Sequence, residues 1–176
     1  AEGMTPEGPD QFVHVKCGHS RLLRRPISIC DWEENLLRIV FEVRGEGTQW
    51  LAQRQAGDKL NVLGPLGNGF SIAADDRLLL VGGGIGVPPL LGQAAFTAKK
   101  ATAVLGFRSA DRAMLVEDYR DYCEEVYLCS DDGSLGRHGF VDAQLKDILE
   151  KDKNFTAVLA CGPKPMLKNV AAVAAG

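Results

Sequence analysis

A glycine-rich segment in the middle of the chain constrains the fold more than any other feature. The segment Gly82 to Pro89, GGGIGVPP, directly follows the apolar run Leu78 to Val81. An apolar run followed by glycines and then by prolines predicts a strand, a tight loop and a helix, because proline is common in the first turn of a helix. Such a loop presents unhindered backbone N–H groups and the positive end of a helix, which together bind phosphate. The alternative is a glycine-rich turn that binds nothing.

The spacing of these glycines limits what the loop predicts. Val87 occupies the last glycine position of the G-x-G-x-x-G dinucleotide fingerprint, so the loop alone indicates a phosphate and not NAD. A second glycine loop, Cys161-Gly162-Pro163, follows the last predicted strand, where open α/β sheets bind ligands. Asp131 lies in a third such loop, and its carboxylate suits a ribose hydroxyl and repels a 2′-phosphate. The alternatives are a buried apolar cysteine and a solvated turn.

The pattern of predicted secondary structure changes within the chain, and this change predicts two domains. Residues 1–73 contain short strands separated by turns, which is typical of an antiparallel β-barrel. Residues 74–176 alternate strand and helix, which predicts an open parallel α/β sheet. The expected early strands are 11–16, 27–30, 36–43 and 59–63, with a helix-like segment over 45–56. The expected later strands are 78–81, 101–106, 125–129 and 157–160, with helices from Pro88, Met114, Val141 and Pro165.

The first half also carries candidate anion-binding residues. Arg25 and Ser28 flank Pro26 and Ile27 at the head of a predicted strand, in the sequence RPIS. A guanidinium and a nearby hydroxyl can bind an anion together. The later segment 45–48, GEGT, begins a helix-like stretch whose N–H groups could take the same anion. The sequence GPLGNGF over 64–70 is explained by structural turns.

Charge and cysteine content exclude several classes of protein. The net charge is −3 with no run of five like charges, so no nucleic-acid or anionic membrane partner is expected. No stretch approaches the roughly 20 apolar residues of a membrane helix. The five cysteines fit neither a metal cluster nor a secreted disulfide scaffold, which predicts a cytoplasmic protein with reduced thiols and no metal ligands.

The order of these motifs along the chain resembles the ferredoxin reductase superfamily. The series is RPIS, GEGT, GPLGNGF, GGGIGVPP, GFR, SDDGS and CGPKPM. Within the superfamily the likeness is strongest to electron-transfer subunits of two-subunit, NAD-linked dihydroorotate dehydrogenases. The resemblance implies an FAD-binding barrel followed by an NAD-binding α/β domain, with hydride passing between the two cofactors and no side chain acting as a general base.

The resemblance also assigns residues to each cofactor. It implies that Ser28 lies beside the flavin and Cys161 beside the nicotinamide. The residues implied for FAD are Arg25, Pro26, Ile27, Ser28, Val40, Phe41, Glu42, Gly47 and Thr48, and those implied for NAD are Gly82, Gly83, Gly84, Ile85, Gly86, Pro88, Asp131, Cys161, Gly162 and Pro163.

The resemblance implies a partner and a further cofactor. The partner is a flavin-carrying catalytic subunit that oxidises dihydroorotate to orotate in pyrimidine biosynthesis, in a heterotetramer. Members of the family carry a [2Fe-2S] cluster on four cysteines whose spacing does not occur here. We also expect that the first strand of the family, before Gln11, is absent. We therefore expect a fragment. The alternatives are a flavin subunit of a hydrogenase or sulfite reductase, a free-standing NADH-dependent reductase, and a nucleotide-binding module without redox activity.

Overall fold

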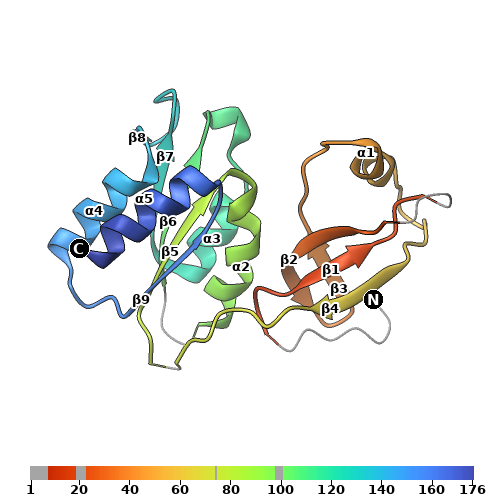
Figure 1. The fold of residues 1–176 in the computed structure, drawn as a ribbon, viewed down its shortest axis with the longest axis horizontal. Coiled ribbons are helices and arrows are strands. Elements are labelled where there is room, and N and C mark those ends of the chain that lie inside the picture. Colours follow the sequence, from red (N-terminus) through yellow and green to blue (C-terminus); the bar gives the residue numbers. More distant parts are fainter. Residues whose placement is uncertain (1–7, 19–22, 74, 98–100) are drawn as a thin grey trace.

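The chain forms two β-sheets that follow one another in sequence. The computed structural model describes residues 8–18, 23–73, 75–97 and 101–176. Figure 1 shows the two sheets side by side, the first with one short helix and the second between several helices. No helix in the described ranges is long and apolar enough to cross a lipid bilayer.

The first sheet is antiparallel and has four strands in the order β3-β2-β1-β4. Alternate residues of its two inner strands, β2 and β1, point into a small core, as a period of two requires. Val13 and Val15 of β1 and Ile27 and Ile29 of β2 are buried there with Leu51. The elements are β1 (Phe12–Val15), β2 (Arg25–Glu33), β3 (Leu36–Ile39), α1 (Glu46–Ala52) and β4 (Val62–Leu66).

The second sheet is parallel and has five strands in the order β8-β7-β6-β5-β9. Its strands are β5 (Leu78–Gly83), β6 (Ala101–Phe107), β7 (Cys123–Ser130), β8 (Arg137–His138) and β9 (Ala157–Cys161). Its helical segments are η1 (Gly84–Gly86), α2 (Val87–Phe96), η2 (Ala110–Arg112), α3 (Val116–Tyr122), α4 (Val141–Lys151) and α5 (Lys164–Ala175).

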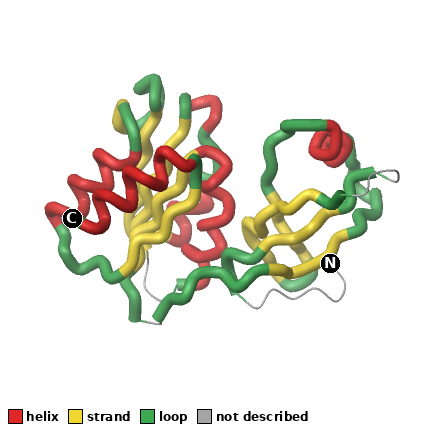
Figure 2. Tube along the Cα trace, viewed as in Figure 1, coloured by secondary structure: helices red, strands yellow, loops and turns green. Residues whose placement is uncertain are grey.

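The central strand β5 is buried on both faces. Leu78 and Leu80 belong to one hydrophobic cluster, with residues of α2 and α3. Leu79 and Val81 belong to a second cluster on the opposite face, with residues of α4 and α5. Figure 2 shows helices on both sides of this sheet. A continuous apolar run is what a strand covered on both faces needs, which explains the sequence LLLV.

The predicted fold class is confirmed. An antiparallel β-sheet precedes a parallel α/β sheet, and each expected strand and helix of the second half is present. Residue 74 lies outside the described residues, so the domain boundary between residues 73 and 74 stays a prediction.

Several element boundaries differ from expectation. β3 ends at Ile39 and not at Val43, because Val40 leaves the sheet and packs against the hydrophobic cluster of the second sheet. β4 begins three residues later than expected, and α1 ends at Ala52 instead of Ala56. α3 begins at Val116 because Leu115 adopts a left-handed conformation with φ of 60°.

Candidate functional site

The carboxyl ends of four parallel strands form one edge at which most residues predicted for NAD gather. Gly82 of β5 pairs with Cys161 of β9, and Gly83 pairs with Gly106 of β6. Phe107 of β6 then pairs with Ser130 of β7, the residue before Asp131. Because neighbouring strands lie about 4.8 Å apart, two strand spacings place the Asp131 loop about 10 Å from the glycine loop. The two glycine loops and the Asp131 loop therefore share one edge.

The two glycine loops pack directly on each other. A Cβ atom on Gly86 would collide with the carbonyl group of Cys161 and would lie 2.6 Å from the backbone nitrogen of Gly162. On the other side, a Cβ atom on Gly162 would lie 2.6 Å from the methyl carbon of Met166. Gly83 is confined in the same way by the sulfur of Met166. The close approach of the two loops thus requires glycine at Gly86, while Gly83 and Gly162 leave room for the Met166 side chain of α5.

Gly84 has a different reason to be glycine. Its φ is +53°, which side chains other than glycine rarely adopt, and a Cβ atom there would meet nothing within 4 Å. It begins the short turn η1, which leads into α2 with prolines in the first helical turn. The backbone at Gly84 therefore borders open space at the start of a helix, as an anion site requires.

Asp131 and Asp132 have separate roles in the third loop. One carboxylate oxygen of Asp132 accepts hydrogen bonds from the backbone nitrogen and the hydroxyl of Ser134, at 2.9 and 2.6 Å. These hydrogen bonds lower the pKa of Asp132. The Ser134 hydroxyl also accepts from the backbone nitrogen of Ala110 at 2.8 Å, which joins this loop to the one after β6. Asp131 is exposed beside this braced turn.

Cys161 is half-buried at the end of β9, and burial raises the pKa of its thiol. The thiol is therefore protonated at neutral pH and is a poor nucleophile. The other four cysteines are buried. Among the described residues, no three histidine, cysteine or acidic side chains lie close enough to hold a metal ion.

We call the first sheet with α1 the first unit, and the second sheet with its helices the second unit. In the first unit, two segments that are about twenty residues apart in the sequence lie together. A Cβ atom on Gly47 would lie 2.7 Å from the Nε atom of Arg25, so the guanidinium of Arg25 lies against the first turn of α1. The hydroxyl of Thr48 accepts from the backbone nitrogens of Arg44 and Gly45 at 2.9 and 3.2 Å. A guanidinium and a helix start thus meet, and both favour an anion.

The other residues predicted for FAD lie near these two segments. Pro26, Ile27 and Ser28 follow Arg25 along β2; Ile27 is buried in the core while Ser28 points to the opposite face and is half-buried. Phe41 packs on the core of the first sheet, whereas Val40 packs on the core of the second. The segment after β3 therefore touches both units.

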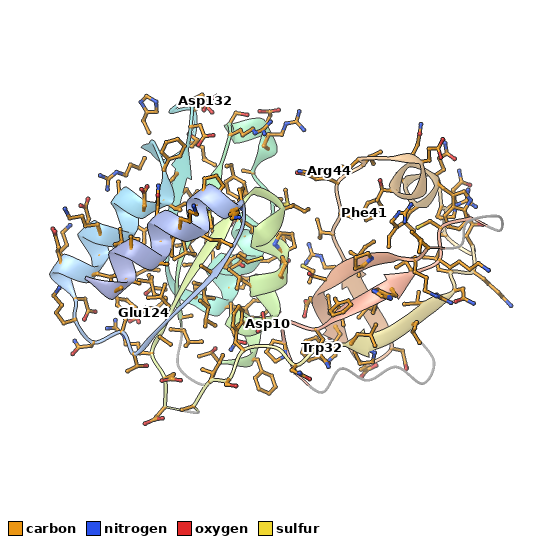
Figure 3. The ribbon with its side chains drawn as sticks, viewed as in Figure 1. Asp10, Trp32, Phe41, Arg44, Glu124 and Asp132 are labelled. Carbon is orange, nitrogen blue, oxygen red and sulfur yellow. The ribbon has the colours of Figure 1, made fainter. Side chains whose placement is uncertain are left out.

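Glu42 ends that segment in an ion pair. Its carboxylate accepts from the Nε atom of Arg44 at 2.6 Å. Figure 3 shows Arg44 pointing from the first unit toward the second, with Phe41 below it. In the view of Figure 1, α1 and the carboxyl ends of the strands of the second sheet lie toward the same side of the molecule.

Sequence reasoning missed the residues at the junction between the two units. Gly92 of α2 and Asp10 lie there, and Figure 3 shows Asp10 beside Trp32 between the units. A lone glycine in a helix interior is a recognised signal of close packing, so Gly92 could have been singled out. Asp10 carries no comparable signal, because an aspartate before a strand is common in turns.

Comparison with known proteins identifies relatives of this chain, although no family model matches it. The chain is 44% identical over 174 residues to the dihydroorotate dehydrogenase B (NAD(+)) electron transfer subunit of Geobacillus kaustophilus, with 93% of the chain and 66% of that protein covered. It is 41% identical to the subunit of the same name from Caldanaerobacter subterraneus, with 91% and 63% covered. The chain thus spans slightly less than two thirds of these relatives.

Solved structures show the same fold. A chain of an NADH-dependent reduced ferredoxin-NADP oxidoreductase superposes with a TM-score of 0.82 at 32% identity, over 96% of this chain and 62% of that one. The ferredoxin reductase of carbazole 1,9a-dioxygenase superposes with a TM-score of 0.77 at 21% identity, over 99% and 57%. The chain therefore belongs to the ferredoxin reductase superfamily, among the relatives of the electron transfer subunits of dihydroorotate dehydrogenase B.

Proposed function

We propose that this chain is the flavin- and NAD-binding part of an electron transfer subunit, in which FAD and NAD exchange a hydride. The observation that carries this proposal is that one chain brings together two sets of residues that suit an anion. One joins Arg25 to Gly47, and the other joins the Gly82 to Gly86 loop to Cys161 and Gly162. Names of relatives at 40–44% identity support the assignment.

The first unit fits the FAD diphosphate. Arg25 supplies a planar cation, and the first turn of α1 at Gly47 and Thr48 supplies backbone N–H groups beside it. We assign the remaining FAD contacts to Pro26, Ile27 and Ser28 on β2 and to Val40, Phe41 and Glu42 after β3, because all of them lie on segments adjoining Arg25 or the junction.

The second unit fits a nicotinamide dinucleotide. The open backbone at Gly84, the prolines at the start of α2, and the paired Cys161-Gly162-Pro163 loop form one edge of the sheet. We assign the diphosphate to this edge, from Gly82 to Gly86 with Pro88. Exposed Asp131 is about two strands away, and its negative charge favours a free ribose hydroxyl over a 2′-phosphate. NAD is therefore preferred to NADP.

The protein's own residues hold and shield the reactants. When bound, the flavin supplies the hydride chemistry, as cofactors do in such enzymes. Because the chemistry belongs to the cofactors, no side chain of the site needs to act as a base. The thiol of Cys161 stays protonated, because burial raises its pKa. The half-buried Ser28 hydroxyl and Cys161 thiol are the side chains that we place beside the reacting rings. The chain thus acts by orientation and exclusion of water.

We further propose the assembly in which this part works. Residues 1–73 form the FAD domain and residues 74–176 the NAD domain. The partner is a flavin-carrying catalytic subunit that oxidises dihydroorotate, in a heterotetramer in the cytoplasm. We assign no [2Fe-2S] cluster to this chain, because the spacing of its five cysteines does not match that of the cluster ligands.

A second candidate is a reductase subunit of another redox complex. It is supported by the likeness at 32% identity to a chain of an NADH-dependent ferredoxin-NADP oxidoreductase. The two candidates share the cofactor sites and differ in the partner. Binding of the purified chain to a dihydroorotate-oxidising subunit, measured by gel filtration, separates them: co-elution supports the first candidate and separate elution with retained NADH oxidation supports the second.

The cofactor assignment is tested by binding and by anaerobic titration. Purified protein incubated with FAD is expected to retain a yellow chromophore, and the cofactor released by heating is expected to be FAD. NADH added without oxygen is expected to bleach the flavin band, whereas NADPH is expected to act more weakly. Protein that binds FAD and NAD without bleaching would instead be a nucleotide-binding module.

A further inference from the structure

The two units meet at a junction that none of the cofactor assignments explains. Cys30 of β2, in the first unit, is fully buried within the hydrophobic cluster of the second sheet. Val40 and Ile72 pack against the same cluster. The two units therefore share part of one core, so their relative position is fixed by side-chain packing and is not left to the connecting segment.

Gly92 lies at a close contact of this junction. It is buried in α2, and a Cβ atom there would lie 3.4 Å from the carbonyl oxygen of Cys30. The same atom would lie 3.6 Å from the Trp32 ring and 3.6 Å from Cβ of Pro9. An alanine would make ordinary contacts, while a larger side chain would have to push α2 away from β2. The contacts at Gly92 thus leave room for about one methyl group between α2 and β2.

An ion pair crosses the junction at a second point. Arg38 of β3 donates to the carboxylate of Asp118 of α3, and both side chains are partly exposed. This hydrogen bond is the main cause of a raised pKa at Arg38. β3 runs directly into Val40 and Phe41, the segment assigned to the flavin, so the pair ties that segment to the second unit.

The same helix is tied to the NAD loop. Tyr119, next to Asp118, is fully buried, and its hydroxyl donates to the backbone oxygen of Val87 at 2.8 Å. Val87 is the first residue of α2, immediately after the glycine loop. Leu115, the residue before α3, has a strained left-handed conformation, and such strain persists where surrounding structure holds it. Contacts thus run without a break from β3 through α3 to the glycine loop.

We propose that Gly92 and the Arg38–Asp118 pair are positioning residues, which set the distance between the flavin segment after β3 and the glycine loop after β5. Neither touches a cofactor site directly. They act by keeping the two units in the one arrangement in which hydride donor and acceptor meet. Hydride transfer needs the reacting atoms within about 3–3.5 Å, and an error of about 1 Å can cost 100-fold in rate. The inference rests on the proposed function for its catalytic consequence, but the junction itself does not.

The test compares Gly92→Val with Gly92→Ala in the FAD-loaded chain. Flavin bleaching is followed by anaerobic stopped flow at saturating NADH, and the dissociation constants for FAD and NAD are measured separately. Gly92→Val is expected to slow bleaching about tenfold or more while both dissociation constants change less than about twofold. Gly92→Ala is expected to bleach at the wild-type rate. A Gly92→Val chain that bleaches as fast as wild type overturns the proposal.

The ion pair is tested with a matched control on the same helix. Asp118→Asn is expected to slow bleaching about three- to fivefold, the size that a partly exposed pair supports. Glu117→Gln removes the neighbouring Arg120–Glu117 pair, which lies within α3 and does not cross the junction, and should have no effect. The exchanged pair Arg38→Asp with Asp118→Arg should recover rate lost in each single variant. Equal slowing by Glu117→Gln, or no recovery, contradicts the assignment.

A readout without cofactors separates the junction from the proposed function. Trp32 lies at the junction, beside Gly92. The only other tryptophan of the sequence is Trp50, so emission in a Trp50→Phe background comes from Trp32 alone. Gly92→Val is expected to shift its emission to longer wavelength, and Gly92→Ala is not. If NADH does not bleach the flavin of the wild-type chain, the proposed function fails. The emission shift then decides alone whether Gly92 holds the two units in place, and absence of the shift overturns that role of Gly92.

Discussion

At the scale of single residues, Arg25 differs from its neighbour Arg24 in what it binds. Arg24 is used within the fold: it donates to the side chain of Asn61 at 2.6 Å and to the backbone oxygen of His14 at 3.3 Å. The guanidinium of Arg25 instead lies against Gly47 at the start of α1. Arg24 is therefore held by hydrogen bonds of the fold, and Arg25 is the arginine that we propose for anion binding.

This difference predicts the outcome of two substitutions. Arg25→Gln should weaken FAD binding about 10- to 100-fold, because a charge-assisted hydrogen bond contributes about 1.5–3 kcal/mol. Arg24→Gln should lower the free energy of unfolding but leave FAD affinity within about twofold. Fluorescence titration with FAD measures both affinities. Equal loss of affinity in the two variants would contradict the assignment of the diphosphate to Arg25.

Asp10 makes stability depend on pH. Burial raises the pKa of Asp10 from 3.8 to about 6, and the backbone of Phe70 acts in the opposite direction. Because the folded state holds the proton more tightly, this group favours folding below pH 4, and that contribution is lost as pH rises through about 6. The shift corresponds to about 3 kcal/mol, which partial exposure reduces to roughly 1–2 kcal/mol.

Asp10→Asn removes this dependence. Relative to wild type, the variant should gain roughly 1–2 kcal/mol of unfolding free energy between pH 4 and pH 7, measured by urea denaturation. Glu124→Gln, an exposed acidic residue for which Figure 3 shows a position away from the junction, is the control and should show no such gain. A constant difference between Asp10→Asn and wild type across this range would show that Asp10 is not shielded.

At the scale of elements, the glycine loop combines two requirements that substitution can separate. Gly86→Ala places a Cβ atom against the Cys161 carbonyl, so it should cost about 1–3 kcal/mol and also displace the Cys161 loop. Gly84→Ala meets no atom within 4 Å and should cost only the roughly 1–2 kcal/mol of its left-handed backbone. Urea denaturation measures both costs.

Thiol labelling reports the displaced loop directly. Cys161 is the one half-buried cysteine among five, and the others are buried. It should react faster in Gly86→Ala than in wild type, and at an unchanged rate in Gly84→Ala. Unchanged labelling in both variants would mean that the two loops do not support each other.

The elements of the second half were more predictable than those of the first. LLLV is apolar at every position, which is the pattern of a strand that is buried on both faces. The structure has helices on both faces of this strand. The expected strand over 36–43 extends beyond the observed β3 because Val40, Phe41 and Val43 are residue types common in strands, yet Val40 packs on the other unit. The start of α3 depends on the backbone of Leu115, for which a leucine gives no signal.

At the scale of the whole molecule, the sequence predicted which segments share a site better than how the two units meet. Carboxyl ends of parallel strands must lie at one edge, so the grouping of the Gly82 to Gly86 loop with Cys161 and Asp131 followed from topology. The contacts of Gly92 with β2 and of Arg38 with Asp118 join residues about 60 to 80 positions apart. No local pattern specifies such pairs.

The central claim is that FAD and NAD lie on one chain and exchange a hydride across this junction. The most direct test mixes FAD-loaded protein with NADH or with NADH deuterated at the transferred position, in an anaerobic stopped-flow cell, and follows the flavin band. The account predicts that the band bleaches in both cases and that deuterium slows the bleaching. A flavin band that stays unchanged at saturating NADH would contradict it.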